Sequence, residues 1–266
     1  MSFTARDGLE IRGYLSQPLN ADKTPGPMVL LIHGGPYGVA DQWRYDREVQ
    51  FLAHHGYTVL QVNYRGSGGR GATFQYDHYG KMGAEMQHDL TDATHWAIEQ
   101  GYADANRICI YGASYGGYAA LMGAAMEPDL YQCSIGYVGL YDISLWRQAD
   151  TMRSEGGRRF VDEAWNYNDD AFVKARSPLT HASKIKAPVM LVHGGKDPRV
   201  PVANYHRMKD ALTQAGNEPV TLLKTYEGHG FYNLENNVGL YDLMLQFLNQ
   251  HIGQASGLVN EPAASP

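Results

Sequence analysis

One pentapeptide, Gly112-Ala-Ser-Tyr-Gly116, constrains the fold of this chain more than any other feature. An apolar, β-rich run over residues 108–111 comes directly before it, and an Ala-, Leu- and Met-rich segment over residues 116–126 follows. A strand that turns this sharply into a helix leaves its serine on a strained bend, and glycines stand where side chains would meet neighbouring backbone. The pattern therefore predicts that Ser114 is a nucleophile rather than a helix N-cap serine.

Strand-like and helix-like segments alternate along most of the chain. The predicted strands are residues 9–15, 28–33, 57–63, 107–112, 134–138, 188–193 and 220–226. The predicted helices are residues 42–55, 83–99, 116–126, 202–214 and 236–251. This alternation is typical of an α/β protein, in which helices cover both faces of a mostly parallel sheet. We expect a helical insertion over the sheet at residues 140–184, one domain over residues 1–252, and a disordered tail at 253–266.

A serine hydroxyl needs a base to remove its proton and a carboxylate to orient that base. In the α/β-hydrolase fold, which the pentapeptide predicts, these groups follow the serine in the order acid, then histidine, each in a loop after a strand. Asp197 and His229 meet that requirement, and we predict that they complete a triad with Ser114. The competing residues lie in the insertion, in predicted helices or beside the wrong strand: Asp142, Asp150, Asp169, Asp170, His181, His206 and His251.

Acyl transfer also needs N–H donors for the negative charge that develops on the carbonyl oxygen. We predict the backbone N–H of Tyr115, the residue after the serine, and that of Gly35 in the loop His33-Gly-Gly-Pro-Tyr37. A plain Gly-Pro turn is the alternative for this loop. An apolar, aromatic acyl pocket is expected, and its candidates, each of which could instead pack in the core, are Tyr37, Trp146, Trp165 and Val200.

Composition excludes several other classes of function. Lys and Arg number 22 against 28 Asp and Glu, and the net charge of −6 argues against nucleic acid or an anionic membrane as the main partner. No apolar stretch reaches the length of a membrane span, and the N-terminus has no signal-like apolar region, so we expect a cytoplasmic protein. The chain has no His-Glu-x-x-His, and no metal site is predicted.

Two further features are interpreted as structural. Gly66-Ser-Gly-Gly-Arg-Gly71 matches a dinucleotide-binding pattern, but residues 72–83 are aromatic, polar and interrupted by glycine, so a loop is expected instead of the helix that pattern requires. No nicotinamide, flavin or other cofactor is predicted. Cys109 and Cys133 lie in apolar runs without Cys-x-x-Cys spacing, and we expect two buried free thiols in preference to a disulfide.

The chain resembles the catalytic domain of the prolyl oligopeptidase family of serine peptidases (family S9), in its acylaminoacyl-peptidase and dipeptidyl-peptidase branch. The matching stretches are His33-Gly-Gly-Pro36, Asn63-Tyr-Arg-Gly-Ser67, Gly112-Ala-Ser-Tyr-Gly-Gly-Tyr118, Ser177-Pro178, His193-Gly-Gly-Lys-Asp197 with Val200-Pro201, and Gly228-His-Gly-Phe231. The resemblance implies the triad Ser114, Asp197 and His229, backbone donors at Gly35 and Tyr115, and cleavage of short peptides without a metal or cofactor.

Family members normally carry an N-terminal β-propeller, which this chain lacks, so we expect a stand-alone hydrolase or an isolated catalytic domain. Peptidase chemistry on short peptides or acyl-aminoacyl substrates is the favoured hypothesis. A carboxylesterase with the same triad is the first alternative, and a non-catalytic binding module of the same fold is the second. Because the mouth of an uncapped site is exposed, we also expect self-association into a homo-oligomer.

Overall fold

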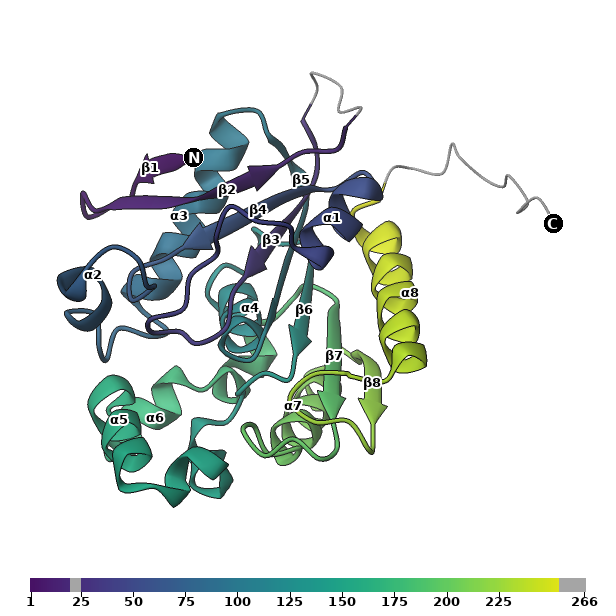
Figure 1. Cartoon of the computed structure of the whole chain (residues 1–266). Helices are drawn as coiled ribbons and strands as arrows, with labels where there is room; N and C mark the ends of the chain where they lie inside the picture. Colours follow the sequence, from purple (N-terminus) through teal and green to yellow (C-terminus); the bar gives the residue numbers. More distant parts are fainter. Residues whose placement is uncertain (20–24, 254–266) are drawn as a thin grey trace.

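A single eight-stranded sheet organises the computed structural model, which describes residues 1–19 and 25–253 (Figure 1). The strand order is β1-β2-β4-β3-β5-β6-β7-β8; the two junctions that involve β2 are antiparallel and the other five are parallel. The strands are β1 (Ser2–Thr4), β2 (Glu10–Ser16), β3 (Gly26–Ile32), β4 (Thr58–Asn63), β5 (Ala103–Ala113), β6 (Cys133–Tyr137), β7 (Val189–Gly194) and β8 (Val220–Lys224).

Helices cover both faces of this sheet. The α-helices are α1 (Arg47–His54), α2 (Ala72–Tyr76), α3 (Glu85–Glu99), α4 (Tyr115–Met126), α5 (Glu155–Trp165), α6 (Asp170–Arg176), α7 (Ala203–Gln214) and α8 (Leu234–His251). Buried side chains of α1 and α8 pack on one face, and those of α3, α4 and α7 pack on the other. Figure 1 shows α8 and α3 on opposite sides of the strands. The predicted α/β-hydrolase fold is therefore confirmed.

The central strands are apolar throughout because both of their faces are covered. Val29 and Leu31 of β3 point into the core under α1 and α8, whereas Leu30 and Ile32 point into the core under α3 and α4. Side chains alternate between the faces of a strand, so a continuous apolar run supplies both cores at once. Each of the seven predicted strands is present, and β1 is an additional short strand that pairs with β2.

Some helix boundaries differ from the predictions. The helix expected from residue 42 begins at Arg47, because the Asp46 side chain accepts hydrogen bonds from the backbone N–H groups of Glu48 and Val49 and caps the helix there. The expectation of no helix after Gly71 is wrong in part, because the five-residue α2 follows that loop. Of the predicted tail, residues 254–266 lie outside the described residues.

Residues 140–184 form the predicted helical insertion. It contains α5 and α6 together with the 3₁₀ segments η1 (Ile143–Gln148), η2 (Asp150–Arg153) and η3 (Pro178–Lys184). Figure 1 shows α5 and α6 beyond the carboxyl ends of the central strands. The carboxyl ends of parallel strands are where active sites form in open α/β sheets, so the insertion lies over the place where the predicted triad should assemble.

The expectation of two free thiols is wrong, because Cys109 and Cys133 form a disulfide. Both cysteines are fully buried, and they lie directly opposite each other on the neighbouring parallel strands β5 and β6. Their Cα atoms are 4.6 Å apart, which is within the range that a disulfide can bridge. Sequence spacing alone does not reveal which strands are neighbours, and the pairing follows from that strand order.

In the described part of the chain, no helix has both the length and the apolar character that crossing a membrane requires.

Candidate active site

Ser114 lies at the junction of β5 and α4, in a backbone conformation that side chains seldom adopt. Its φ is 59° and its ψ is −119°, and its N–H donates a hydrogen bond to the carbonyl oxygen of Tyr137 at 2.8 Å. Any side chain at Gly112 or Gly116 would collide with backbone: a Cβ would lie 2.6 Å from the carbonyl carbon of Gly116 in the first case and 2.1 Å from the Ile32 oxygen in the second. The two glycines therefore permit the bend that presents the hydroxyl.

The three residues predicted from the sequence come together in one hydrogen-bonded chain. His229 Nε2 is 2.9 Å from Ser114 Oγ, and His229 Nδ1 is 2.7 Å from Asp197 Oδ2. An ionised carboxylate can only accept, so Nδ1 carries the hydrogen and Nε2 is left to accept the hydrogen of the serine hydroxyl. Residues separated by 115 positions in the sequence thus form a base and a hydroxyl in the orientation that proton transfer needs.

Hydrogen bonds within the loop after β7 orient the carboxylate of Asp197. Asp197 Oδ1 accepts the backbone N–H groups of Arg199 and Val200, each at 2.9 Å, and this leaves Oδ2 for the histidine. His193, fully buried at the end of β7, donates from Nε2 to the Val200 carbonyl oxygen at 3.0 Å and so joins the two ends of the loop. Burial lowers the pKa of His193, which keeps its ring neutral.

The loop that contains Gly35 packs directly against the serine. A Cβ placed on Gly34 would be 3.5 Å from the Cβ of Ser114, so the backbones approach closely there. His33 Nδ1 donates to the Gly34 carbonyl oxygen at 2.8 Å, and His33 Nε2 accepts from the Ser67 hydroxyl at 2.9 Å. Burial lowers the pKa of His33 to about 4, so this arrangement of the neutral ring persists at neutral pH.

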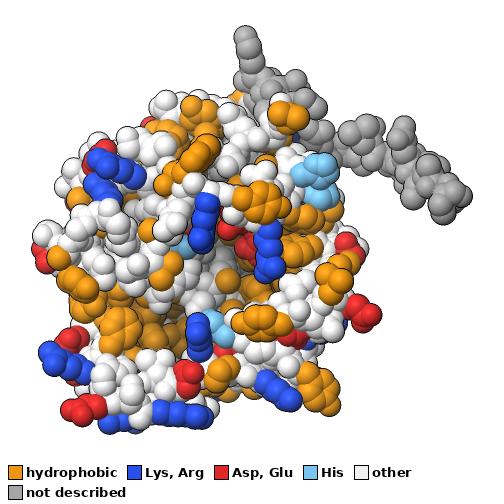
Figure 2. Space-filling view, in the orientation of Figure 1, with side chains coloured by type: hydrophobic (Ala, Val, Ile, Leu, Met, Phe, Trp, Pro, Cys, Tyr) orange, Lys and Arg blue, Asp and Glu red, His pale blue; other side chains and the backbone are white. Residues whose placement is uncertain are grey.

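A cavity of about 490 Å³ opens at these residues. Ser114, His229, Gly35 and Tyr115 all line it, so both predicted oxyanion donors border the space in which the hydroxyl lies. Figure 2 shows the molecule hollowed between the insertion and the main body, with hydrophobic side chains around the hollow and a histidine at its edge. The volume is that of a small-molecule or short-peptide site.

Three of the four predicted pocket residues line this cavity, namely Trp146, Trp165 and Val200. Tyr37 does not, and its hydroxyl instead donates to the carbonyl oxygens of His78 and Ala164, so it ties the loop after β3 to α5. The other lining residues include several that were not predicted: Val39, Tyr137, Val138, Leu140, Thr151, Phe160 and Arg199. Most belong to the insertion or to the end of β6, and only the folded arrangement brings them to the serine.

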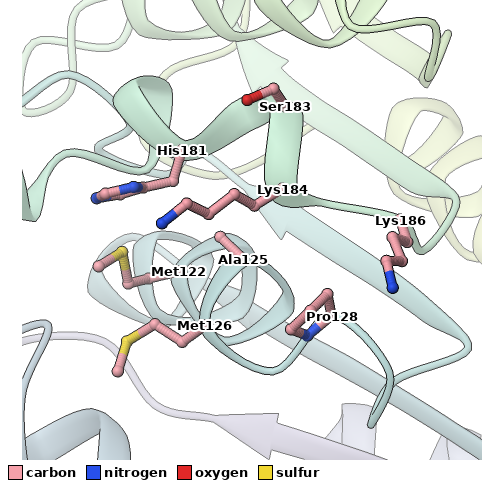
Figure 3. Close-up of a pocket in the computed structure, with 8 residues that line it drawn as sticks. All are labelled: Met122, Ala125, Met126, Pro128, His181, Ser183, Lys184 and Lys186. Carbon is pink, nitrogen blue, oxygen red and sulfur yellow. The ribbon is translucent and has the colours of Figure 1, made fainter.

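A second groove lies at the far end of α4 (Figure 3). Its floor is formed by Met122 and Met126, and Lys184 reaches over it from η3. Twelve residues of α4 separate the two ends of the helix, which is about 18 Å at the helical rise per residue. Lys186 at its rim is paired with Asp129 at 2.8 Å. The groove is therefore separate from the triad, and its lysines stand where a helix C-terminus favours positive charge.

Within residues 1–19 and 25–253, no group of three or more His, Cys, Asp or Glu side chains is arranged to hold a metal ion.

Fold and site together define a serine hydrolase of the α/β-hydrolase class. The model of the prolyl oligopeptidase family matches residues 43–255, and the chain belongs to that family, as predicted. Dipeptidyl aminopeptidase BIII of Pseudoxanthomonas mexicana is 35% identical over 277 residues, an alignment that covers 95% of this chain and 38% of the relative. Acylamino-acid-releasing enzyme 2 of Oryza sativa subsp. japonica is 32% identical over 206 residues, covering 74% of this chain and 26% of the relative.

Solved structures show the same relationship. Pyrococcus horikoshii acylaminoacyl peptidase superposes with a TM-score of 0.87 at 25% sequence identity, covering 98% of this chain and 42% of that protein. A puromycin-hydrolyzing peptidase of Mycobacterium tuberculosis also gives 0.87 at 25% identity, covering 95% of this chain and 39% of that protein. The chain thus spans well under half the length of these relatives.

Proposed function

We propose that this chain hydrolyses amide bonds in short peptides or acyl-aminoacyl substrates through an acyl-enzyme on Ser114. The observation that carries the proposal is the hydrogen-bonded chain from Asp197 Oδ2 through His229 to Ser114 Oγ. Membership of the prolyl oligopeptidase family supports the peptidase assignment, because the relatives named above include a dipeptidyl aminopeptidase and an acylamino-acid-releasing enzyme.

In the first half-reaction, His229 Nε2 removes the proton of Ser114 as Oγ bonds to the substrate carbonyl carbon. The carbonyl oxygen becomes an oxyanion that the backbone N–H groups of Gly35 and Tyr115 stabilise, and Asp197 stabilises the imidazolium. When the tetrahedral intermediate collapses, the C–N bond breaks and the imidazolium gives its proton to the leaving amine. In the second half-reaction, His229 Nε2 removes a proton from water as the water oxygen bonds to the acyl carbon. The bond from that carbon to Ser114 Oγ then breaks, the imidazolium returns the proton to Oγ, and the carboxylic acid leaves.

The acyl side of the substrate is proposed to occupy the aromatic part of the cavity. Trp146 and Trp165 meet edge to face with ring centroids 4.2 Å apart, and Val200 borders the same space. A pocket of this kind favours apolar or aromatic acyl groups, since they bury the most apolar area without leaving polar atoms unpaired.

Replacement of the nucleophile tests the proposal directly. Ser114→Ala should lower kcat on an aminoacyl nitroanilide by at least about a thousandfold, because the attacking oxygen is gone. It should also abolish covalent labelling by a fluorophosphonate probe, whereas the exposed Ser183→Ala control should retain both. Turnover or labelling of the Ser114→Ala variant at the wild-type level would refute the proposal, and an unlabelled wild-type chain would favour a non-catalytic binding module.

The choice of substrate separates the peptidase from a carboxylesterase with the same triad. We expect measurable turnover of aminoacyl and acyl-aminoacyl nitroanilides as well as of short acyl p-nitrophenyl esters. Activity on the esters alone, at every amide substrate concentration tested, would make the esterase the correct assignment.

A further inference from the structure

The imidazole of His229 lies at the tip of a short loop that joins β8 to α8. Gly228 and Gly230 face each other across an isolated antiparallel bridge, which places the histidine at the apex of a tight turn. Gly230 has a φ of 134°, a conformation that glycine adopts readily. The position of the His229 imidazole therefore depends on how firmly the two ends of this loop are held.

Tyr137 holds one end of this loop. Its hydroxyl accepts a hydrogen bond from the backbone N–H of Phe231 at 2.5 Å, and the two rings pack edge to face with centroids 5.3 Å apart. The carbonyl oxygen of the same tyrosine accepts the N–H of Ser114 at 2.8 Å. Tyr137 therefore contacts both the backbone of Ser114 and the backbone of the loop that carries His229, residues 227–233, here called the base loop. It does so from the end of β6, which lies between β5 and β7.

Glu227 holds the other end. Its carboxylate accepts hydrogen bonds from the backbone N–H groups of Tyr232 at 2.9 Å and Asn233 at 3.0 Å, and from the side chain of Asn236 at 2.7 Å. The residue that enters the loop is thereby joined to the residues that begin α8. Glu227 is only 6% exposed, so these donors would lose their main acceptor if the carboxylate were removed.

We propose that Tyr137 and Glu227 are positioning residues that clamp the loop of the catalytic base, so that His229 Nε2 stays within hydrogen-bonding reach of Ser114. The inference rests on the proposed function of His229 as a base. Tyr137 acts through the backbone on both sides of the reacting pair, and Glu227 fixes where the loop starts. The clamp keeps proton transfer ready without a conformational step in each turnover.

Tyr137→Phe removes one oxygen atom and keeps the ring, and it leaves the N–H of the buried Phe231 without an acceptor. Tyr137 also lines the cavity, but the variant keeps its ring there. We expect kcat to fall about tenfold with little change in KM, because the productive position of the base becomes a minor one while the apolar lining is kept. Tyr131→Phe is the matched control: that tyrosine is also buried, its hydroxyl pairs with Thr94 at 3.3 Å, and it lies near the opposite end of β6. The kcat of Tyr131→Phe should stay at the wild-type value.

Amide hydrogen exchange supplies a readout that does not depend on turnover. Peptides covering residues 227–233 should exchange faster in Tyr137→Phe and in Glu227→Gln than in the wild type, because each variant weakens one anchor of the loop. The Tyr131→Phe control should leave exchange in these peptides unchanged. Glu227→Gln also tests the clamp if the tyrosine variant does not fold, and it should lower kcat in the same way.

The proposal is overturned if both variants keep kcat within twofold of the wild type, or if residues 227–233 exchange no faster in them. It is also overturned if Tyr131→Phe loses as much kcat as Tyr137→Phe, since the effect would then be general destabilisation. These failures are distinct from failure of the proposed function, in which the wild-type chain itself shows neither hydrolysis nor fluorophosphonate labelling.

Discussion

Arg65 is a buried guanidinium that two carboxylates share. Its Nη1 is 2.6 Å from Asp7 in the turn between β1 and β2, and its Nη2 is 2.6 Å from Asp89 in α3. The arginine is 5% exposed and Asp89 is fully buried. Loss of either partner would leave an uncompensated charge in the interior, which is strongly destabilising. Asp7 is the exposed member, and the hydrogen bond from Arg65 lowers its pKa to about 2.

This ion pair predicts how stability depends on pH. The pKa of Asp7 is lower in the folded chain than its ordinary value of 3.8, so its stabilising effect is complete above about pH 4 and is lost as the pH falls toward 2. Asp7→Asn should therefore lower the free energy of unfolding at pH 7 by roughly 0.5 kcal/mol, a small amount because nearly half of the Asp7 side chain is exposed. Urea unfolding from pH 7 down to pH 2 should show the free energies of unfolding of the wild type and of Asp7→Asn converging as the pH falls. A difference that stays constant with pH would contradict the assignment.

At the residue scale, the sequence predicts side chains whose chemistry requires a fixed order along the chain. Ser114, Asp197 and His229 were accessible to prediction because each must follow a strand in a fixed succession. Tyr137 was not, because nothing in the pattern of β6 indicates that its hydroxyl reaches a loop 94 residues away. Contacts between side chain and backbone over such separations depend on strand order and loop path, which the sequence alone does not give.

At the scale of elements, the turn from β5 into α4 is the tightest junction at the site. Gly116 is the second residue of α4, and its backbone is packed so closely that a Cβ would lie 2.1 Å from the carbonyl oxygen of Ile32 in β3. Helix α4 and strands β3 and β5 therefore share one fixed arrangement. The strand–turn–helix context predicted this junction, whereas α2 was missed because five residues are too few to produce a helical repeat.

Two glycine substitutions of opposite effect test this packing. Gly116→Ala should lower the free energy of unfolding by about 3 kcal/mol or more and abolish fluorophosphonate labelling, because the new methyl group collides with backbone that cannot move aside. Gly239→Ala in α8 meets no atom within 4 Å, and it should raise stability by about 0.5–1 kcal/mol through better helix propensity. Equal effects of the two variants in thermal unfolding would show that the close approach at Gly116 does not exist.

At the scale of the whole molecule, large apolar side chains remain uncovered beside the base loop. Tyr226 and Tyr232 flank His229 in the sequence and are each 83% exposed, and Leu234 at the start of α8 is 76% exposed. Single exposed apolar residues are ordinary, but several close together in the chain favour association.

We therefore expect this chain to self-associate in a concentration-dependent manner. Light scattering should give a mass above that of one chain at high concentration, and a Tyr232→Ser, Leu234→Ser double variant should shift the mass toward that of the monomer. Tyr76→Ser, which changes an exposed tyrosine in α2 that is 52% accessible, should have no effect. A monomer at every concentration of the wild type would contradict the expectation.

The spacing of the triad along the polypeptide has a consequence for folding. The hydrogen bond between Ser114 and His229 closes 115 residues of chain, and the strands that precede its two partners stand at β5 and β8, with β6 and β7 between them. Because loop-closure entropy opposes a contact over such a separation, we expect it to form after the intervening strands have paired. During refolding, hydrolysis should therefore return only when the edge strand β8 has docked, and later than the circular dichroism signal of the helices. Recovery of activity would then report that this half of the sheet has reached its native strand order.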